Sequence, residues 1–166
     1  MDAIYRELLR GRRAHVDPLA SLEEVSAEVA GRTIEGYPHS IWQIVGHMNY
    51  WMEYEIRRIA GEHPAYPEHA IQSWPSSLVP GSEEEWVRAK QGFAEGIERL
   101  GEISQASPDV LQQTVDAMHE KEGPRSTSVE AVLWQIMVHN SYHVGQIAMM
   151  LRCFGIWPPR AGGDTW

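Results

Sequence analysis

Two histidines four residues apart, His139 and His143, interrupt the apolar pattern of VLWQIMVHNSYHVGQIAMMLRCFG, which covers residues 132–155. Four residues advance an α-helix by just over one turn, so the two imidazoles project from adjacent turns, about 6 Å apart along the axis. Neutral imidazole is a preferred ligand of zinc, nickel, copper and iron. The pair therefore has the spacing of two ligands to one divalent transition metal ion.

The two histidines also occupy positions on the face of this helix that we expect to be buried. Residues of this face recur at spacings of four and three, as in a heptad seam. They are Val132, Ile136, His139, His143, Ile147, Met150 and Phe154. A buried imidazole needs a hydrogen-bond partner or another ligand. The pair is therefore either part of a metal site or a pair of hydrogen-bonded core histidines.

His47 is the candidate for a third ligand. Of the other six histidines it alone lies inside a predicted helix, on the same side as Ile44, Trp51 and Tyr54. Three histidines from two facing helices leave coordination positions open for water or substrate, which is typical of catalytic metal sites. Without a metal, His47 is an ordinary histidine at a helix interface.

Two familiar metal motifs are excluded. The H-E-x-x-H motif of metalloproteases requires a glutamate as general base, and Asn140 occupies that position here. Di-iron bundles require paired Glu-x-x-His elements on two helices, and the predicted helices contain none.

Helical periodicity dominates the chain and strand patterns are nearly absent, so the sequence predicts an all-α protein. We expect four major helical segments, with Ser40, Ser82 and Asp17-Pro18 as start signals. They cover residues 2–30 with a break near His15, 41–60, 82–101 and 128–155, and a short turn near 108–113 and a polar loop through 123–124 precede the last. The fold class is an up-and-down-type four-helix bundle with a long crossing loop.

The crossing loop, residues 61–80, contains four prolines and two aromatic anchors, Tyr66 and Trp74, which excludes long regular elements without indicating disorder. It either covers the candidate site or forms a dimer contact. Exposed aromatic residues usually mark contact surfaces, and Trp74, Trp157 and Trp166 lie in loops or at the carboxyl terminus. We therefore expect a homodimer.

Composition limits the remaining possibilities. The 166 residues, 43% of them hydrophobic, suit a single domain spanning 1–166. A formal net charge of -9 disfavours binding to nucleic acid or anionic membranes. Cys153 is the only cysteine, and no apolar run approaches the roughly 20 residues that span a bilayer. We expect a cytoplasmic protein.

The segments PHSIWQIVGHMNYW and HNSYHVGQI, about ninety residues apart, make the chain resemble the DinB-like (YfiT-related) metal-binding four-helix-bundle superfamily. The resemblance implies a divalent ion, zinc or nickel, bound by His47, His139 and His143, and frequent homodimers. It also implies transferase or isomerase chemistry with a low-molecular-weight thiol such as bacillithiol, mycothiol or glutathione, or metal-dependent hydrolysis.

These observations lead to one functional hypothesis and two rivals. The hypothesis is a metal-dependent thiol S-transferase or hydrolase that acts on a small-molecule substrate, with a pKa-lowering metal ion and no general base identified. The rivals are a non-catalytic metal-binding bundle and a helical interaction protein. Four residues are expected to line the substrate cavity: Trp51, Tyr54, Tyr142 and Gln146.

Overall fold

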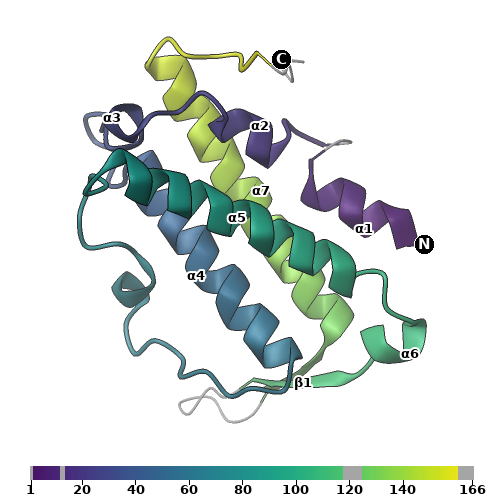
Figure 1. Cartoon of the computed structure of the whole chain (residues 1–166). Helices are drawn as coiled ribbons and strands as arrows, with labels where there is room; N and C mark the ends of the chain where they lie inside the picture. The colour runs from purple at the N-terminus through teal and green to yellow at the C-terminus, as the bar shows by residue number, and fades with distance from the viewer. Residues whose placement is uncertain (1, 12–13, 118–124, 161–166) are drawn as a thin grey trace.

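The computed structural model describes residues 2–11, 14–117 and 125–160 of the chain, and these residues are mainly helical. Three long helices form the body: α4 (Ile41–Ile59), α5 (Glu83–Ile103) and α7 (Val129–Cys153). Helix α4 packs against both α5 and α7 (Figure 1). The predicted all-α class is confirmed, and so are the helices predicted at 41–60, 82–101 and 128–155.

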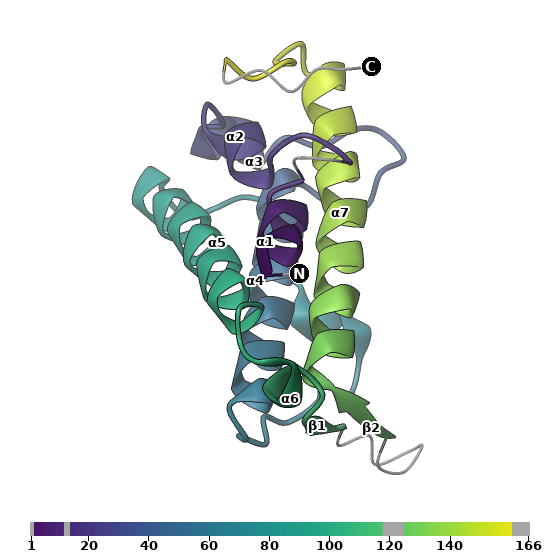
Figure 2. The same cartoon turned by 90° about the vertical axis from the view of Figure 1, so that its right-hand side faces the viewer.

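Three short helices occupy the place of the expected first long helix: α1 (Asp2–Leu9), α2 (Pro18–Leu22) and α3 (Ala27–Ala30). The expected break near His15 is present, and Asp17 caps α2 by accepting a hydrogen bond from the backbone N–H of Leu19. A second break was not expected, and Ser26 caps α3 after it. Helix α1 lies between α5 and α7 (Figure 2), where Arg6 bonds Glu98 on α5.

The three long helices begin where the sequence predicts, because a serine caps each of them. The side chains of Ser40, Ser82 and Ser128 each accept a hydrogen bond from the backbone N–H three residues further on. A capping serine satisfies one of the backbone donors left free in the first turn of a helix. These caps fix the start of α4 and α7, and with it the positions of the histidines along each helix.

A small β-hairpin corrects the expectation of a loop before α7. Helix α6 (Pro108–Leu111) is followed by β1 (Thr114–Ala117), which pairs antiparallel with β2 (Arg125–Ser128). Strands of four residues carry too little alternation to be recognised from sequence. Val115 is buried, and β1 packs against α4, so tertiary contact supports the strand. The loop predicted through 123–124 lies outside the described residues.

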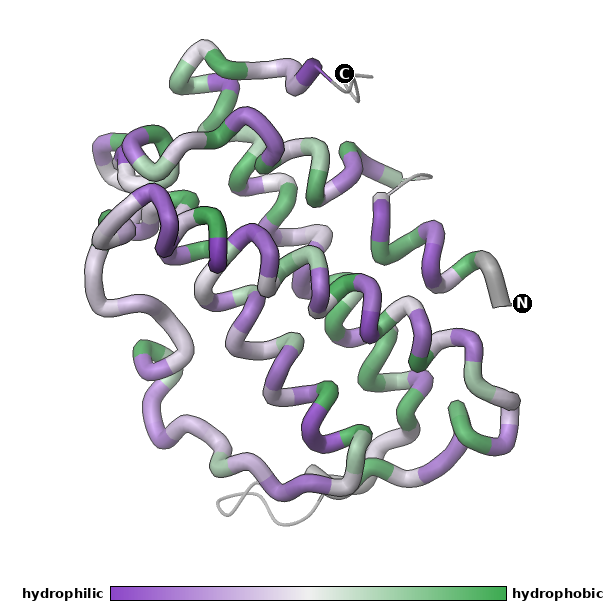
Figure 3. Tube along the Cα trace, viewed as in Figure 1, coloured by the Kyte–Doolittle hydropathy of each residue, from purple (hydrophilic) through white to green (hydrophobic). Residues whose placement is uncertain are grey.

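The buried hydrophobic residues of α4, α5 and α7 form one cluster, which the short helices extend. Hydrophobic and hydrophilic residues alternate along these helices, as expected where each buries one face (Figure 3). The predicted seam of α7 is buried except at His139 and Phe154, which are half-buried. Within the parts of the chain that the structure describes, every helix is too short or too polar to cross a bilayer.

The long crossing loop runs from α4 to α5 and contains one short 3₁₀ helix, η1 (Ala70–Ser73). Its second half packs along α4. Ser40 donates a hydrogen bond to the backbone carbonyl of Leu78 at 2.6 Å, and Gln43 donates to that of Pro75 at 2.8 Å. The loop therefore lies beside the α4 residues that precede His47.

Candidate metal centre

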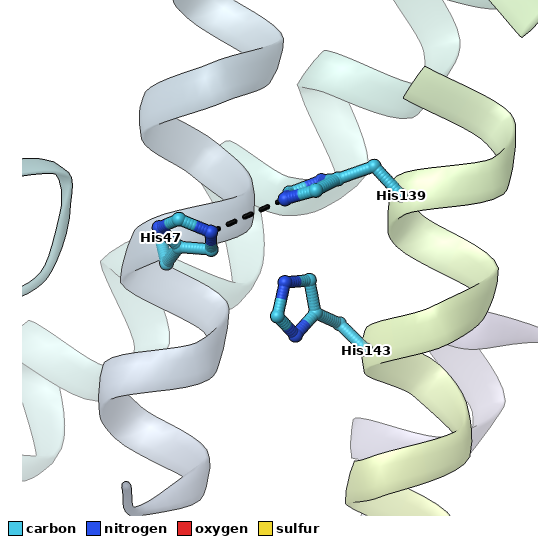
Figure 4. Close-up of side chains that lie close together, drawn as sticks. All are labelled: His47, His139 and His143. Atoms are coloured by element: carbon cyan, nitrogen blue, oxygen red, sulfur yellow. Dashed lines mark hydrogen bonds between the residues drawn. The ribbon is translucent and has the colours of Figure 1, made fainter. Parts of the chain in front are cut away.

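The three predicted ligands come together between α4 and α7. His47 projects from α4, and His139 and His143 project toward it from successive turns of α7 (Figure 4). One ring nitrogen from each histidine lies within 4.8 Å of the others. The four-residue spacing on α7 and the start of α4 at Ser40 are what align these side chains.

The hydrogen bonds of His47 fix which of its nitrogens carries the proton. Its Nδ1 lies 2.9 Å from the hydroxyl of Ser73, and that hydroxyl donates its own hydrogen to the carbonyl of Ala70 at 2.7 Å. Ser73 can therefore only accept from His47, so Nδ1 bears the hydrogen. The lone pair of Nε2 therefore faces α7, where it lies 3.2 Å from Nε2 of His139.

Each of the two histidines of α7 has a side-chain oxygen near its Nδ1. Nδ1 of His143 lies 2.6 Å from the side-chain oxygen of Gln146, and Nδ1 of His139 lies 3.4 Å from that of Asn140. An amide oxygen only accepts, so Nδ1 of His143 bears a hydrogen. Nδ1 of His139 makes the longer contact, and its Nε2 forms a 3.2 Å hydrogen bond with Nε2 of His47 (Figure 4). The rings of His47 and His143 thus present an unprotonated Nε2, the arrangement that outer hydrogen bonds impose on metal-binding histidines.

This arrangement suits a cation. The Nε2 atoms of His47 and His139 are 3.2 Å apart and joined by a hydrogen bond, which a metal ion bound to both nitrogens would replace. A tetrahedral zinc ion with bonds of about 2.0–2.1 Å separates two ligand nitrogens by roughly 3.3 Å. The donor set and its spacing therefore fit a transition metal ion.

The electrostatic surroundings keep the histidines neutral. Burial, together with smaller effects of charge on His143 and His139, lowers the pKa of His47 to about 3. Burial also lowers the pKa of His143 to about 4, and it lowers that of His139. Because ligation requires neutral imidazole, the cluster is in its metal-binding protonation state at neutral pH.

The four residues expected to line the cavity lie in different settings. Trp51 packs edge-on against His47, with ring centroids 6.3 Å apart, and the buried Tyr54 packs in turn against Trp51. Tyr142 is 65% exposed and lies edge-on to His143. Gln146 accepts the hydrogen bond from His143, so its first role is to orient a ligand. Their contact with substrate stays a prediction.

Sequence reasoning missed two residues of this centre, Ser73 and Trp74. The indole of Trp74 stacks on the imidazole of His47, with centroids 3.8 Å apart and planes 9° apart. The expectation that Trp74 is an exposed contact residue is wrong, because the side chain is half-buried against the site. Trp157 is also half-buried, and Trp166 lies outside the described residues. A contact across 27 positions of chain has no local sequence signal.

The described residues place no carboxylate or thiol in this cluster, which consists of three imidazoles. Neutral ligands leave the full charge of a divalent ion uncompensated, so an anionic further ligand is favoured. The thiol of Cys153 is exposed at the end of α7, ten residues beyond His143. Among the described residues, the chain itself therefore offers the cluster no anionic ligand.

Comparison with known proteins agrees with the architecture. The family model described as the DinB family matches residues 4–163, so the chain belongs to the DinB family. No curated protein matches the chain.

Proposed function

We propose that this member of the DinB family is a metal-dependent enzyme that transfers groups to or from a small thiol. His47, His139 and His143 hold one divalent transition metal ion, zinc or nickel. The observation that carries the proposal is the convergence of three imidazoles, with one ring nitrogen of each within 4.8 Å of the others and no charged side chain in the cluster.

A divalent ion in this site would supply Lewis-acid chemistry, lowering the pKa of a thiol or water molecule bound at an open position. The chain's own residues prepare that chemistry. Ser73 and Gln146 hold the histidine rings in the ligating tautomer, and the indoles of Trp51 and Trp74 pack around His47 and exclude water from it. These contacts preorganise the site, so little is reordered when a ligand arrives.

A thiol is favoured over water as the bound nucleophile because the described residues of the cluster include no carboxylate that could act as a general base. A free thiol has a pKa near 8.5 and water one near 15.7, so a thiol needs much less assistance to ionise near neutral pH. Among the described residues no carboxylate joins the cluster as a base. Hydrolysis is the second candidate, supported by the three-histidine donor set itself, which is also used to activate water.

A titration of the cobalt-substituted protein with 2-mercaptoethanol tests the proposal. Protein purified without a histidine tag is stripped of metal and reloaded with one equivalent of Co²⁺. We expect the thiol to produce a new near-ultraviolet charge-transfer absorption, which requires sulfur bound to the ion. The band should vanish in His143→Ala.

Two results contradict the proposal at different levels. Protein that retains no Co²⁺ after gel filtration has no metal site, which leaves the interaction-protein rival. Protein that binds Co²⁺ but shows no thiol-dependent band, even at saturating 2-mercaptoethanol, excludes thiol chemistry and favours hydrolysis or a non-catalytic metal site.

A further inference from the structure

Three consecutive loop residues, Ser73, Trp74 and Pro75, contact α4 at His47 and at the residues just before it; we call them the clamp. Ser73 accepts the hydrogen bond from Nδ1 of His47 at 2.9 Å. Trp74 stacks on the same imidazole ring, and its indole edge also meets the ring of His143, with centroids 5.8 Å apart. The clamp thus contacts two of the three candidate ligands from outside the cluster.

Trp74 lies between two histidines. The ring of His39 is also stacked on it, with centroids 3.8 Å apart and planes 9° apart, the same values as for His47. Two rings cannot share one indole face at this separation without overlapping, so they lie on opposite faces. The indole plane is therefore held from both sides, and it fixes the plane of the His47 ring.

Pro75 packs closely against α4 and holds the clamp in position. A methyl group added at Gly46 would lie only 2.3 Å from the ring of Pro75, so the loop approaches α4 at a point where only glycine fits. The side chain of Gln43 donates to the Pro75 carbonyl at 2.8 Å and lies 3.4 Å from Nδ1 of His39. Gln43 thus links His39, at one end of the stack, to the loop residue that follows Trp74.

From these contacts we infer that the clamp is the outer shell of the metal centre and sets its metal affinity. This inference rests on the proposed metal site. Trp74 and Ser73 act as positioning residues: they hold the His47 ring plane and tautomer before the ion arrives. Outer contacts of this kind typically change metal affinity about 10–100-fold when removed.

Coupling between two sites is reciprocal, so bound metal must also hold the clamp in place. An ion that fixes His47 fixes the ring on which Trp74 stacks and the donor that Ser73 accepts from. The order of the second half of the crossing loop, residues 70–80, should therefore depend on whether the metal is bound. The backbone of these residues should exchange hydrogen more slowly when the metal is bound.

The test measures Zn²⁺ affinity by competition with a chromophoric chelator in four variants. Trp74→Leu removes the aromatic stack, and Trp74→Phe keeps it. Gly46→Ala displaces Pro75 without touching a ligand, while Gly145→Ala is its matched control on α7, because a methyl group there meets nothing within 4 Å. We expect Trp74→Leu and Gly46→Ala to lose about 10–100-fold in affinity, and Trp74→Phe and Gly145→Ala to stay within about 3-fold of wild type.

Hydrogen exchange of residues 70–80, with Zn²⁺ and with EDTA, supplies the second readout. Zinc should slow exchange in wild type and in Gly145→Ala, and this difference should disappear in Gly46→Ala. If Trp74→Leu does not fold, Gly46→Ala and Trp74→Phe still carry the test.

The outcomes separate the clamp from the metal site. Unchanged affinity in Gly46→Ala and Trp74→Leu, with loop exchange independent of zinc, overturns the clamp and leaves the proposed function standing. Wild-type protein that binds no zinc overturns both.

Discussion

The Nε2 atoms of His47 and His139 lie 3.2 Å apart, although 92 positions of chain separate the two residues. Packing of α4 against α7 brings them together, and the hydrogen bond between Nδ1 of His47 and Ser73 turns the Nε2 lone pair of His47 toward His139. This pair joins the two helices at the proposed metal site. The predictions below follow from it and from its surroundings.

Metal binding should resist mild acid. Burial lowers the pKa values of His47 and His143 to about 3 and about 4, so protons begin to compete with metal well below the ordinary histidine value near 6.5. We expect zinc to be retained down to about pH 5 and lost as the pH falls toward about 4. Dialysis across this range followed by metal analysis measures it. Release complete by about pH 6 would show that the histidines titrate as exposed groups.

The metal-free protein should lose stability on acidification. Its histidines have lower pKa values when folded than when unfolded, so the unfolded state binds more protons below about pH 6.5 and is favoured as the pH falls. Thermal unfolding in EDTA between about pH 7 and pH 4.5 measures this slope. The control is the double variant His47→Gln and His143→Gln, which should show a shallower slope. Equal slopes would contradict the prediction.

Gln146 should raise the zinc affinity of the site through its hydrogen bond with His143. Gln146→Leu leaves Nδ1 of His143 without its acceptor at 2.6 Å, and we expect zinc affinity to fall about 10-fold or more. Gln146→Glu provides a charged acceptor and should retain or raise affinity. Gln135→Leu, at an exposed position of the same helix, is the matched control. Chelator competition compares the three variants, and equal affinities would rule out this role for Gln146.

A buried ion pair should matter more to folding than an exposed one. Arg58 bonds Glu55 at 2.5 Å, and both side chains are less than one-tenth exposed. Burial raises the pKa of Glu55, and Arg58 opposes that shift. Arg58→Ala should lower the free energy of unfolding by about 3 kcal/mol, because it leaves a buried carboxylate unpaired. Urea unfolding measures the loss. Arg57→Ala, which breaks a half-exposed pair with Glu62, should have little effect.

The expected homodimer has a candidate surface on α7. Four exposed apolar side chains share one face of this helix: Trp134, Val138, Tyr142 and Met149. Two copies of such a face can pack about a two-fold axis. Light scattering should give a dimer mass for wild type and a monomer mass for Val138→Glu, with metal content unchanged because all ligands come from one chain. A monomeric wild type would refute the prediction.

The sequence predicted those features of the fold and the site that depend on residues close together in the chain. The histidine spacing on α7 follows from helix geometry, and Ser40 and Ser128 mark helix starts because capping uses residues within one turn. His47 could be selected because it shares a helix with Ile44 and Trp51.

Determinants that depend on tertiary contact were not predictable. The hairpin depends on the burial of Val115, and the second break in the amino-terminal segment has only the short cap at Ser26 to signal it. Trp74 was misplaced because its partners are distant in the sequence: His39 just precedes α4 and His47 lies within it. Proline content predicted the irregular loop, but it carries no information about which side of the loop faces the metal centre.

Metal content per chain tests the central claim most directly. Wild-type protein, His139→Ala and His63→Ala are purified without a histidine tag, reloaded with zinc and dialysed against a mild chelator. His63 is exposed in the crossing loop and lies outside the histidine cluster, so His63→Ala is the control. We predict one equivalent of zinc in wild type and in His63→Ala, and none in His139→Ala. A full equivalent retained by His139→Ala would contradict the three-histidine site.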